Sequence, residues 1–230
     1  MKQTNAVTPP ERPGLTPDAI IETAIALADQ HGVGAVTIRR VAANLGVTPM
    51  ALYWHFTKKD DLLAGMVEWV FRQIDVPGDT GIGWEPRFRA LMESELAVLR
   101  RHPELASLMI SHESMSTAML EAMELSLGLL REAGFTPTEA VQVIQHAQLS
   151  VINLALRQPG RSTERDPRLV EEQERQALAS IVALPPDRYP HIIEAAAPLS
   201  RCEDPDRYYA FGLDMLMAGI RAMAESTRPL

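Results

Sequence analysis

The side chains best placed to do chemistry form a short basic stretch near the N-terminus. From His31 to Lys59 the chain has no Asp or Glu, yet this segment also carries Arg39, Arg40 and Lys58. The whole chain has a net charge of −8, so the other residues together are strongly acidic. A basic patch on an acidic body attracts phosphate while the body repels wrong docking. The pattern predicts contact with nucleic-acid phosphates at this patch.

Two short helical patterns position the patch. The first has an apolar stripe of Ile38, Val41, Ala42 and Leu45. Thr37 can cap it, because a Thr hydroxyl accepts a hydrogen bond from an unpaired backbone N–H, and Gly46 can end it in the left-handed conformation. The second opens at Thr48-Pro49 and runs to Phe56, since Pro suits the first helical position. Helix, Gly-containing turn and helix are typical of a helix-turn-helix, whose second helix can enter the major groove of DNA.

The run LGVTPMALYWHFTKKDDLL, residues 45 to 63, resembles the DNA-binding domain of the TetR (tetracycline-repressor) family of bacterial regulators. The preceding IIETAIALADQHGVGAVTIRRVAANLGV resembles the first two helices of that family. The resemblance implies an all-α fold, with an N-terminal helix-turn-helix domain joined to a larger helical domain for ligand binding and dimerisation. It also implies a DNA-binding regulator, most often a repressor, that binds an inverted-repeat operator as a homodimer and is released by a small effector.

The resemblance assigns DNA contacts to particular residues. They are Thr37, Arg39, Thr48, Pro49, Met50, Ala51, Tyr53, Trp54, His55 and Lys59. Thr37 and Thr48 stand at helix N-termini, where backbone N–H groups favour phosphate, and Lys59 matches a phosphate-binding Lys of the family. Tyr53, Trp54 and His55 are expected against phosphate and sugar. For Trp54 and Phe56 the alternative is packing between helices, which is favoured for Phe56.

The expected base-facing positions are apolar. Pro49, Met50 and Ala51 predict readout through thymine methyl groups, with Arg39 as the main hydrogen-bond donor to a base. Family members with Gln or Thr at these positions differ, so the operator sequence stays open.

Composition limits the class of protein. The chain has 230 residues, 46% of them hydrophobic and 23% charged, which suffices for a sizeable core. One cysteine, Cys202, excludes an intramolecular disulfide framework and indicates a reducing, cytoplasmic location. No signal peptide is recognisable, and no apolar run approaches the ~18 residues of a membrane span, so no membrane partner is expected.

The chain is expected to divide at the Gly-rich break VPGDTGIG, residues 76 to 83. We expect a mobile tail over 1–14, the helix-turn-helix domain over 15–76 and the ligand-binding and dimerisation domain over 77–230. Beyond the break every segment has a helical pattern, with a polar loop at 158–167 whose order stays open. The expected helices there are 84–101, 103–110, 114–133, 137–157, 168–184, 187–197 and 205–225.

Dimerisation is expected through residues 137–157 and 205–225, because TetR-family members pair two long C-terminal helices in a four-helix interface. Gly212 and Gly219 lie on one face of the last helix, with Leu216 between them, and would let backbones approach closely. Packing of these glycines against a helix of the same subunit is the open alternative.

An effector pocket is expected along the helix at 137–157. Val141, Ile144, Gln148, Val151 and Ala155 share one face, and a buried amide such as Gln148 needs a partner. The candidate ligand-binding residues are Met109, His112, Met115, Met119, Val141, Ile144, Gln145 and Gln148. Methionines suit an adaptable apolar pocket, although ordinary core methionines and solvated or core histidines are the alternative.

No catalytic, metal or cofactor site is predicted. HExxH, CxxC and nucleophile-elbow patterns do not occur, and His112 and Glu113 are adjacent rather than one helical turn apart. An all-helical enzyme would need a convergent acid–base set, and the sequence shows none. A constitutive DNA-binding regulator without a small-molecule effector stays open.

The segments RRHPELASLM, REAGFTPTEA and PDRYYAFGLDMLMAG resemble the body of the tetracycline repressors themselves. The resemblance places that group's metal-binding His on Met109 and a drug-binding Asn on Leu91. A thioether is a poor ligand for magnesium, which prefers oxygen. We therefore expect a metal-free, mostly apolar effector.

Overall fold

The protein is all-α, as predicted. The computed structural model describes residues 15–75, 78, 81–111, 116–157, 166–202 and 204–227, and these contain helices and no strand. The expected tail at 1–14 and most of the expected loop at 158–167 lie outside the described residues. So do Val76, Pro77, Asp79 and Thr80 of the expected domain break.

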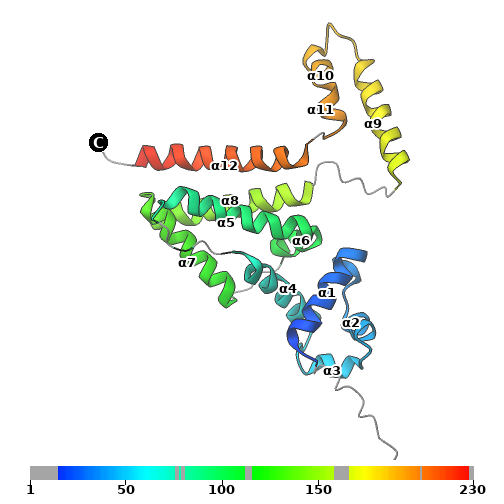
Figure 1. Cartoon of the computed structure of the whole chain (residues 1–230), viewed down its shortest axis with the longest axis vertical. Helices are drawn as coiled ribbons and strands as arrows, with labels where there is room; N and C mark the ends of the chain where they lie inside the picture. The colour runs from blue at the N-terminus through cyan, green and yellow to red at the C-terminus, as the bar shows by residue number, and fades with distance from the viewer. Residues whose placement is uncertain are drawn as a thin grey trace, which may run out of the picture.

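The helices form three groups along the long axis of the molecule (Figure 1). At one end lie α1 (Pro17–His31), the short 3₁₀ turn η1 (Val33–Ala35), α2 (Ile38–Leu45), α3 (Pro49–Tyr53) and α4 (Lys59–Gln73). The middle holds α5 (Trp84–Arg101), α6 (Pro103–Ser111), α7 (Thr117–Glu132), α8 (Pro137–Arg157) and α12 (Pro205–Thr227). At the other end stand α9 (Pro167–Val182), α10 (Pro190–Glu194) and α11 (Ala196–Ser200).

The first four helices share one core. The predicted stripe of α2 is largely buried, including Val41, and so are apolar side chains of α1 and α4 such as Ile20 and Met66. Gly65 allows α4 to approach α1 closely, because a Cβ there would lie 2.7 Å from Ile21 Cδ1. Leu52 of α3 completes this core with no exposed surface. The packing holds α2 and α3 at a fixed angle to each other.

Local capping sets the ends of these helices as predicted. The Thr37 hydroxyl accepts a hydrogen bond from Arg40 N–H at 3.2 Å, and Gly46 has a φ of +67°. At the start of α4, Lys58 N–H donates to Asp61 Oδ2 at 3.2 Å. A hydrogen bond from the Thr57 hydroxyl lowers the pKa of the Asp61 carboxyl. The start of α4 is therefore well defined.

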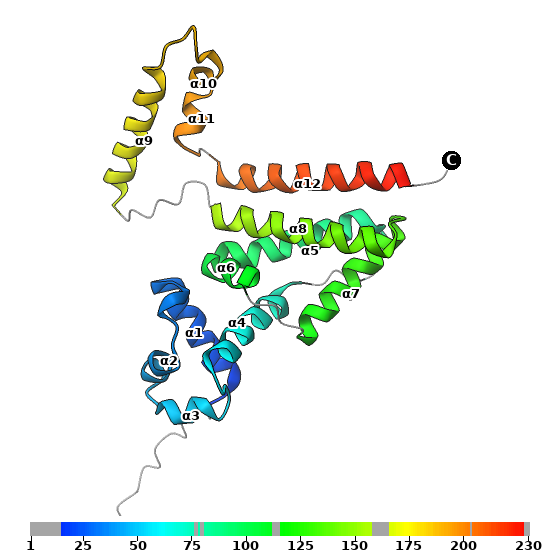
Figure 2. The same cartoon turned by 180° about the vertical axis from the view of Figure 1, so that it is seen from behind.

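The middle helices pack around α5 and α8 (Figure 2). α8 begins with a capping box, in which Thr136 N–H donates to Glu139 Oε2 at 2.8 Å and Glu139 N–H to Thr136 Oγ1 at 3.3 Å. α12 lies against α5 and α8, and Arg89 of α5 bonds Asp214 of α12 at 2.7 Å. This exposed ion pair contributes little to stability, so apolar packing holds α12 in place.

Two predicted helices were wrong in extent. α3 ends at Tyr53 rather than Phe56, because the N–H groups of His55 and Phe56 both donate to Leu52 O at 2.9 Å and turn Phe56 into the core. The expected helix at 187–197 is broken into α10 and α11. The break lies at Ala195, and Pro198 of α11 has no N–H to donate to Glu194 O, so this bond of the helical ladder is missing.

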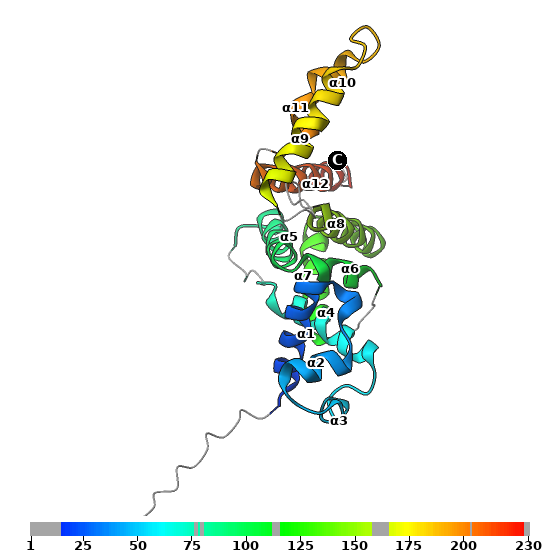
Figure 3. The same cartoon turned by 90° about the vertical axis from the view of Figure 1, so that its right-hand side faces the viewer.

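Helices α9 to α11 pack on one another and stand away from the other helices (Figure 3). Neither α9 nor α10 has a buried residue. The side view places this arm and α3 at opposite ends of an elongated molecule. No helix among the described residues is long and apolar enough to cross a membrane.

Candidate nucleic-acid interface and ligand cavity

Helix α3 presents an exposed surface at one end of the molecule (Figure 1). Leu52 faces the core, whereas Met50 is 66% exposed and Trp54, in the turn after α3, is 85% exposed. Packing between helices is thus wrong for Trp54 and correct for Phe56, which is buried. An exposed Trp of this size marks a contact surface rather than a core position.

The predicted DNA contacts lie in or next to α2, α3 and α4. Arg39, Thr48, Tyr53, His55 and Lys59 are exposed, as are Thr37, Pro49 and Met50, while Ala51 is half-buried. Arg39 stands in the first turn of α2 and Lys59 is the first residue of α4. The helix dipole adds positive potential at the start of α2, whereas the carboxylates of Asp60 and Asp61 offset it in the first turn of α4. The arrangement suits contact with phosphates.

A cavity of about 70 Å³ lies within the middle helices. Four helices line it, and its walls are mostly apolar. The lining residues are Phe71 and Ile74 at the end of α4, Leu91, Met92 and Glu95 of α5, Met119, Ala122, Met123 and Ser126 of α7, and Ile144 and Gln148 of α8. Because α4 contributes to the wall, the cavity adjoins the same helix whose first turn carries Lys59.

The predicted ligand-binding residues divide into three groups. Met119, Ile144 and Gln148 line the cavity. His112 and Met115 lie outside the described residues. Met109, Val141 and Gln145 do not line this cavity, and their role as ligand-binding residues stays a prediction.

Val141 and Gln145 are exposed on α8, whereas Ile144 and Gln148, which line the cavity, are half-buried. Val141 also lies two helical turns before Gln148, roughly 10 Å along the helix axis. Met109 is close to Met119 only in sequence; it packs from α6 against the core.

Glu95 is the lining residue that the sequence prediction missed. Its side chain is 4% exposed, and its Oε1 is buried without a hydrogen-bond partner among the described residues. Burial raises the pKa of the Glu95 carboxyl to about 8. The spacing of Phe88, Leu91, Glu95 and Leu99 by three or four residues could have revealed it, because it places Glu95 on the buried stripe of α5.

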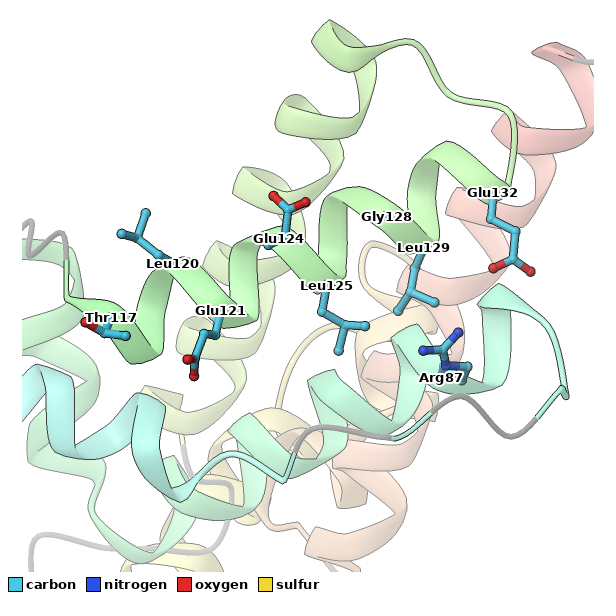
Figure 4. A pocket seen from close by; sticks show the side chains of 9 residues that line it. All are labelled: Arg87, Thr117, Leu120, Glu121, Glu124, Leu125, Gly128, Leu129 and Glu132. Carbon is cyan, nitrogen blue, oxygen red and sulfur yellow. The ribbon is translucent and has the colours of Figure 1, made fainter.

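A larger groove, of about 710 Å³, runs along the outer side of α7 (Figure 4). Leu125 and Leu129 point toward α5 and Arg87, whereas Glu124 and Leu120 point away. Most of its lining side chains, among them Glu121 and Glu124, are exposed. An open groove cannot surround a small molecule, so the cavity at Glu95 is the stronger candidate ligand site.

The free faces of α8 and α12 carry large exposed apolar side chains. They are Leu149, Leu156, Phe211, Met215 and Met223. Two grooves of about 410 and 450 Å³ lie between these helices. A Cβ on Gly212 would lie 2.6 Å from Leu154 Cδ2, so Gly212 packs within its own chain, the alternative considered above. Gly219 has open space and lines one of the grooves with Leu216.

The exposed helix-turn-helix on an all-helical body defines a DNA-binding protein of the regulator class. Residues 20–66 match the family model described as "Bacterial regulatory proteins, tetR family". Residues 76–224 match "Tetracyclin repressor-like, C-terminal domain". The chain belongs to the TetR family of transcriptional regulators.

Individual relatives agree with this family. The transcriptional repressor DrrR1 of Streptomyces coeruleorubidus is 32% identical over 225 residues, which cover 94% of this chain and 81% of the relative. Tetracycline repressor protein class C of Escherichia coli is 25% identical over 220 residues, 93% of this chain and 94% of the relative. The structure of ActR from Streptomyces coelicolor in complex with actinorhodin matches with a TM-score of 0.78 and 26% identity, over 92% of this chain and 99% of ActR. The relatives matched by sequence are named as regulators of transcription, not as enzymes.

Proposed function

We propose that the protein binds an inverted-repeat DNA operator as a homodimer and represses transcription until a small, mostly apolar molecule releases it. The DNA-binding part is supported by the exposed surface of Arg39, Lys59 and the residues of α3. Phosphate neutralisation by one such surface gives only weak, salt-sensitive binding. Two copies that reach successive major grooves, about 34 Å apart, would supply specific affinity. The naming of DrrR1 as a repressor supports the direction of regulation.

Homodimerisation is supported by the free faces of α8 and α12. Phe211 and Met215 are each 63% exposed on a helix whose other side is already buried in the chain. A helix that is apolar on both sides requires a second partner. The grooves between α8 and α12 can receive the ridges of the same helices from another copy, as in a four-helix interface.

The proposal of effector release is supported by the position of α4, which runs from the DNA-binding domain to the cavity. Phe71 and Ile74 line the cavity at one end of this helix, and Lys59 stands at its other end. His102, at the C-terminal end of α5, also bonds Asp29 of α1 at 2.8 Å, next to Trp69 of α4. A ligand that enlarges the cavity would displace the end of α4, and a rigid helix would transmit the movement to the DNA surface.

We place the domain boundary between residues 76 and 77, giving a DNA-binding domain at 15–76 and a ligand-binding and dimerisation domain at 77–230. The two family models support this division, because one ends at residue 66 and the other begins at 76.

A constitutive regulator with no effector is the second candidate. The small size of the cavity, about 70 Å³, favours it, because ligand pockets in proteins usually measure roughly 300–1,000 Å³. An effector of drug size would have to open the cavity by moving Met119 and Met123, both of α7.

Selection of bound fragments from sheared genomic DNA, followed by a compound screen for release, tests the proposal. We expect enrichment of an inverted repeat, protection of two half-sites on one face of the DNA, and release by a metal-free compound. Enrichment of sites without two-fold symmetry would overturn the homodimer reading. An inverted repeat that no compound releases would favour the constitutive regulator.

A further inference from the structure

One lining residue of the cavity, Glu95, is a buried acid. Glu95 projects from α5 among apolar side chains that include Leu91 and Met92. Its Oε1 is buried with no hydrogen-bond partner among the described residues. Carboxyl groups are among the least often buried side chains, and natural proteins rarely leave a buried polar atom unpaired. A polar partner from outside the chain would satisfy this atom.

No cation within the cavity pairs with Glu95. The described lining residues from α4, α7 and α8 include no titratable side chain, and Ser126 and Gln148 are the polar ones. The Ser126 hydroxyl already donates to Ala122 O at 2.7 Å. Burial is the cause of the raised pKa of Glu95, and no neighbouring charge contributes to it. The cavity therefore has an unmatched acidic group and an amide that can hydrogen bond.

We infer that the effector carries a basic nitrogen on an apolar skeleton, and that Glu95 is its counter-ion. This inference rests on the proposed effector-responsive function. The methionines and leucine of the wall would take the skeleton, and Gln148 would offer a second hydrogen bond. An anionic ligand would meet Glu95 with no cation to offset it. The acidic chain, with its net charge of −8, also attracts cations rather than anions.

The inference predicts that binding of an amine releases a proton and becomes tighter as pH rises. In the empty cavity a carboxyl whose pKa is about 8 holds its proton at neutral pH. An ammonium ion that binds as the counter-ion leaves the carboxylate unprotonated, so one proton passes to solvent for each molecule bound. Between pH 6 and 8 the affinity for an amine should rise, by up to about tenfold per pH unit. An uncharged molecule of the same shape should show no such rise.

The experiment titrates the full-length protein, without DNA, with benzylamine, benzyl alcohol and toluene. These single-ring probes suit a small cavity and share one skeleton. Calorimetry in buffers of different ionisation enthalpy measures both affinity and proton release. We expect benzylamine to bind more tightly as pH rises from 6 to 8 with release of a proton, and benzyl alcohol not to.

Substitution of Glu95 then tests whether its carboxylate is the group that pairs with the amine. Glu95→Gln should weaken benzylamine binding at pH 8 by at least about tenfold and leave toluene binding nearly unchanged. Glu124→Gln is the matched control, since it removes the same charge from an exposed site of the α7 groove. If Glu95→Gln does not fold, the pH dependence of the wild type decides alone.

Three results would overturn the inference. None of the probes binds, benzylamine and benzyl alcohol bind with equal pH dependence, or Glu124→Gln loses benzylamine binding while Glu95→Gln keeps it. Operator binding by the same preparations separates these failures from failure of the proposed function. Intact operator binding with no amine site would overturn the inference only. An amine site that depends on Glu95 but never affects operator binding would support the inference as to binding and contradict effector release.

Discussion

The Glu95 carboxyl should make the stability of the protein depend on pH. Its pKa is about 8 in the folded chain, against 4.5 for an ordinary Glu. Between these values the unfolded chain has lost a proton that the folded chain keeps. The stabilisation by this proton is complete below about pH 4.5 and is lost as pH rises toward 8. Relative to Glu95→Gln, the free energy of unfolding of the wild type should fall by roughly 1 kcal/mol per pH unit between pH 5 and 8.

Urea unfolding of both proteins at four pH values and one fixed protein concentration measures this difference. Comparison with Glu95→Gln cancels the other titrating groups. Parallel pH curves for the two proteins would show that Glu95 is solvated in the empty protein.

Arg39 and Lys59 should differ in how they affect DNA binding. We propose that Lys59 contacts a phosphate, so Lys59→Ala should weaken binding to all sequences and reduce the salt slope by about one. We propose that Arg39 donates a hydrogen bond to a base, so Arg39→Ala should also relax sequence preference, at a cost of roughly 1–3 kcal/mol for the specific site. Titrations of operator and scrambled DNA at several salt concentrations measure both effects.

Arg168→Ala is the control, because it removes one positive charge from exposed α9, at the other end of the molecule. Wild-type binding by both Lys59→Ala and Arg39→Ala would show that the assigned surface does not contact DNA.

Single residues also show what the sequence could and could not reveal. The capping role of Thr37 and the left-handed turn at Gly46 depend on local chemistry, and both predictions were confirmed. The exposure of Trp54 and the burial of Glu95 depend on which side of a helix meets its neighbours. Sequence spacing narrows that choice but does not decide it, because a neighbouring helix can cover or leave open the same stripe.

At the scale of helices, α12 illustrates the same limit. It spans Pro205–Thr227, close to the expected 205–225, and the Arg207 N–H donates to Asp204 Oδ1 at 3.0 Å at its start. Leu213 and Ile220 are buried, whereas Phe211 and Met223 are exposed. The helix is apolar on more than one side, so periodicity alone could not separate the face that packs within the chain from the free one.

Gly219→Arg tests the free face of α12. Nothing lies within 4 Å of a Cβ at this position, and Arg is a better helix former than Gly by roughly 1 kcal/mol, so the subunit should fold. In a dimer the long charged side chain would stand where we expect two helices to touch. Size-exclusion chromatography with light scattering should show a folded monomer with lost operator affinity.

Gly128→Arg is the control, because it makes the same change at an exposed position of α7 with equally open space. It should remain dimeric. If Gly219→Arg also remains dimeric, the interface lies elsewhere.

At the scale of the whole molecule, the proposed DNA surface and the cavity share α4, and the cavity and the free α8–α12 face share α8. The order of these parts followed from the resemblance to the TetR family. The size of the cavity did not, because it depends on how closely α5, α7 and α8 pack. The side chains that line the cavity, rather than the fold, therefore determine which ligand can bind in it.

Tetracycline with magnesium should not release this protein from its operator, although residues 76–224 match the family model of the tetracycline-repressor-like C-terminal domain. The resemblance places the metal-binding His of those repressors on Met109 and a drug-binding Asn on Leu91. Met109 packs against the core, and Leu91 is buried in the cavity wall. The polar edge and charge of the chelate would be left unpaired in an apolar cavity, at a cost of roughly 4 kcal/mol or about a thousandfold in affinity. Titration of the operator complex with drug and magnesium, followed by fluorescence anisotropy of labelled DNA, measures release. A tetracycline repressor on its own operator serves as the positive control, and release of this protein at micromolar drug would contradict the assignment of a metal-free effector.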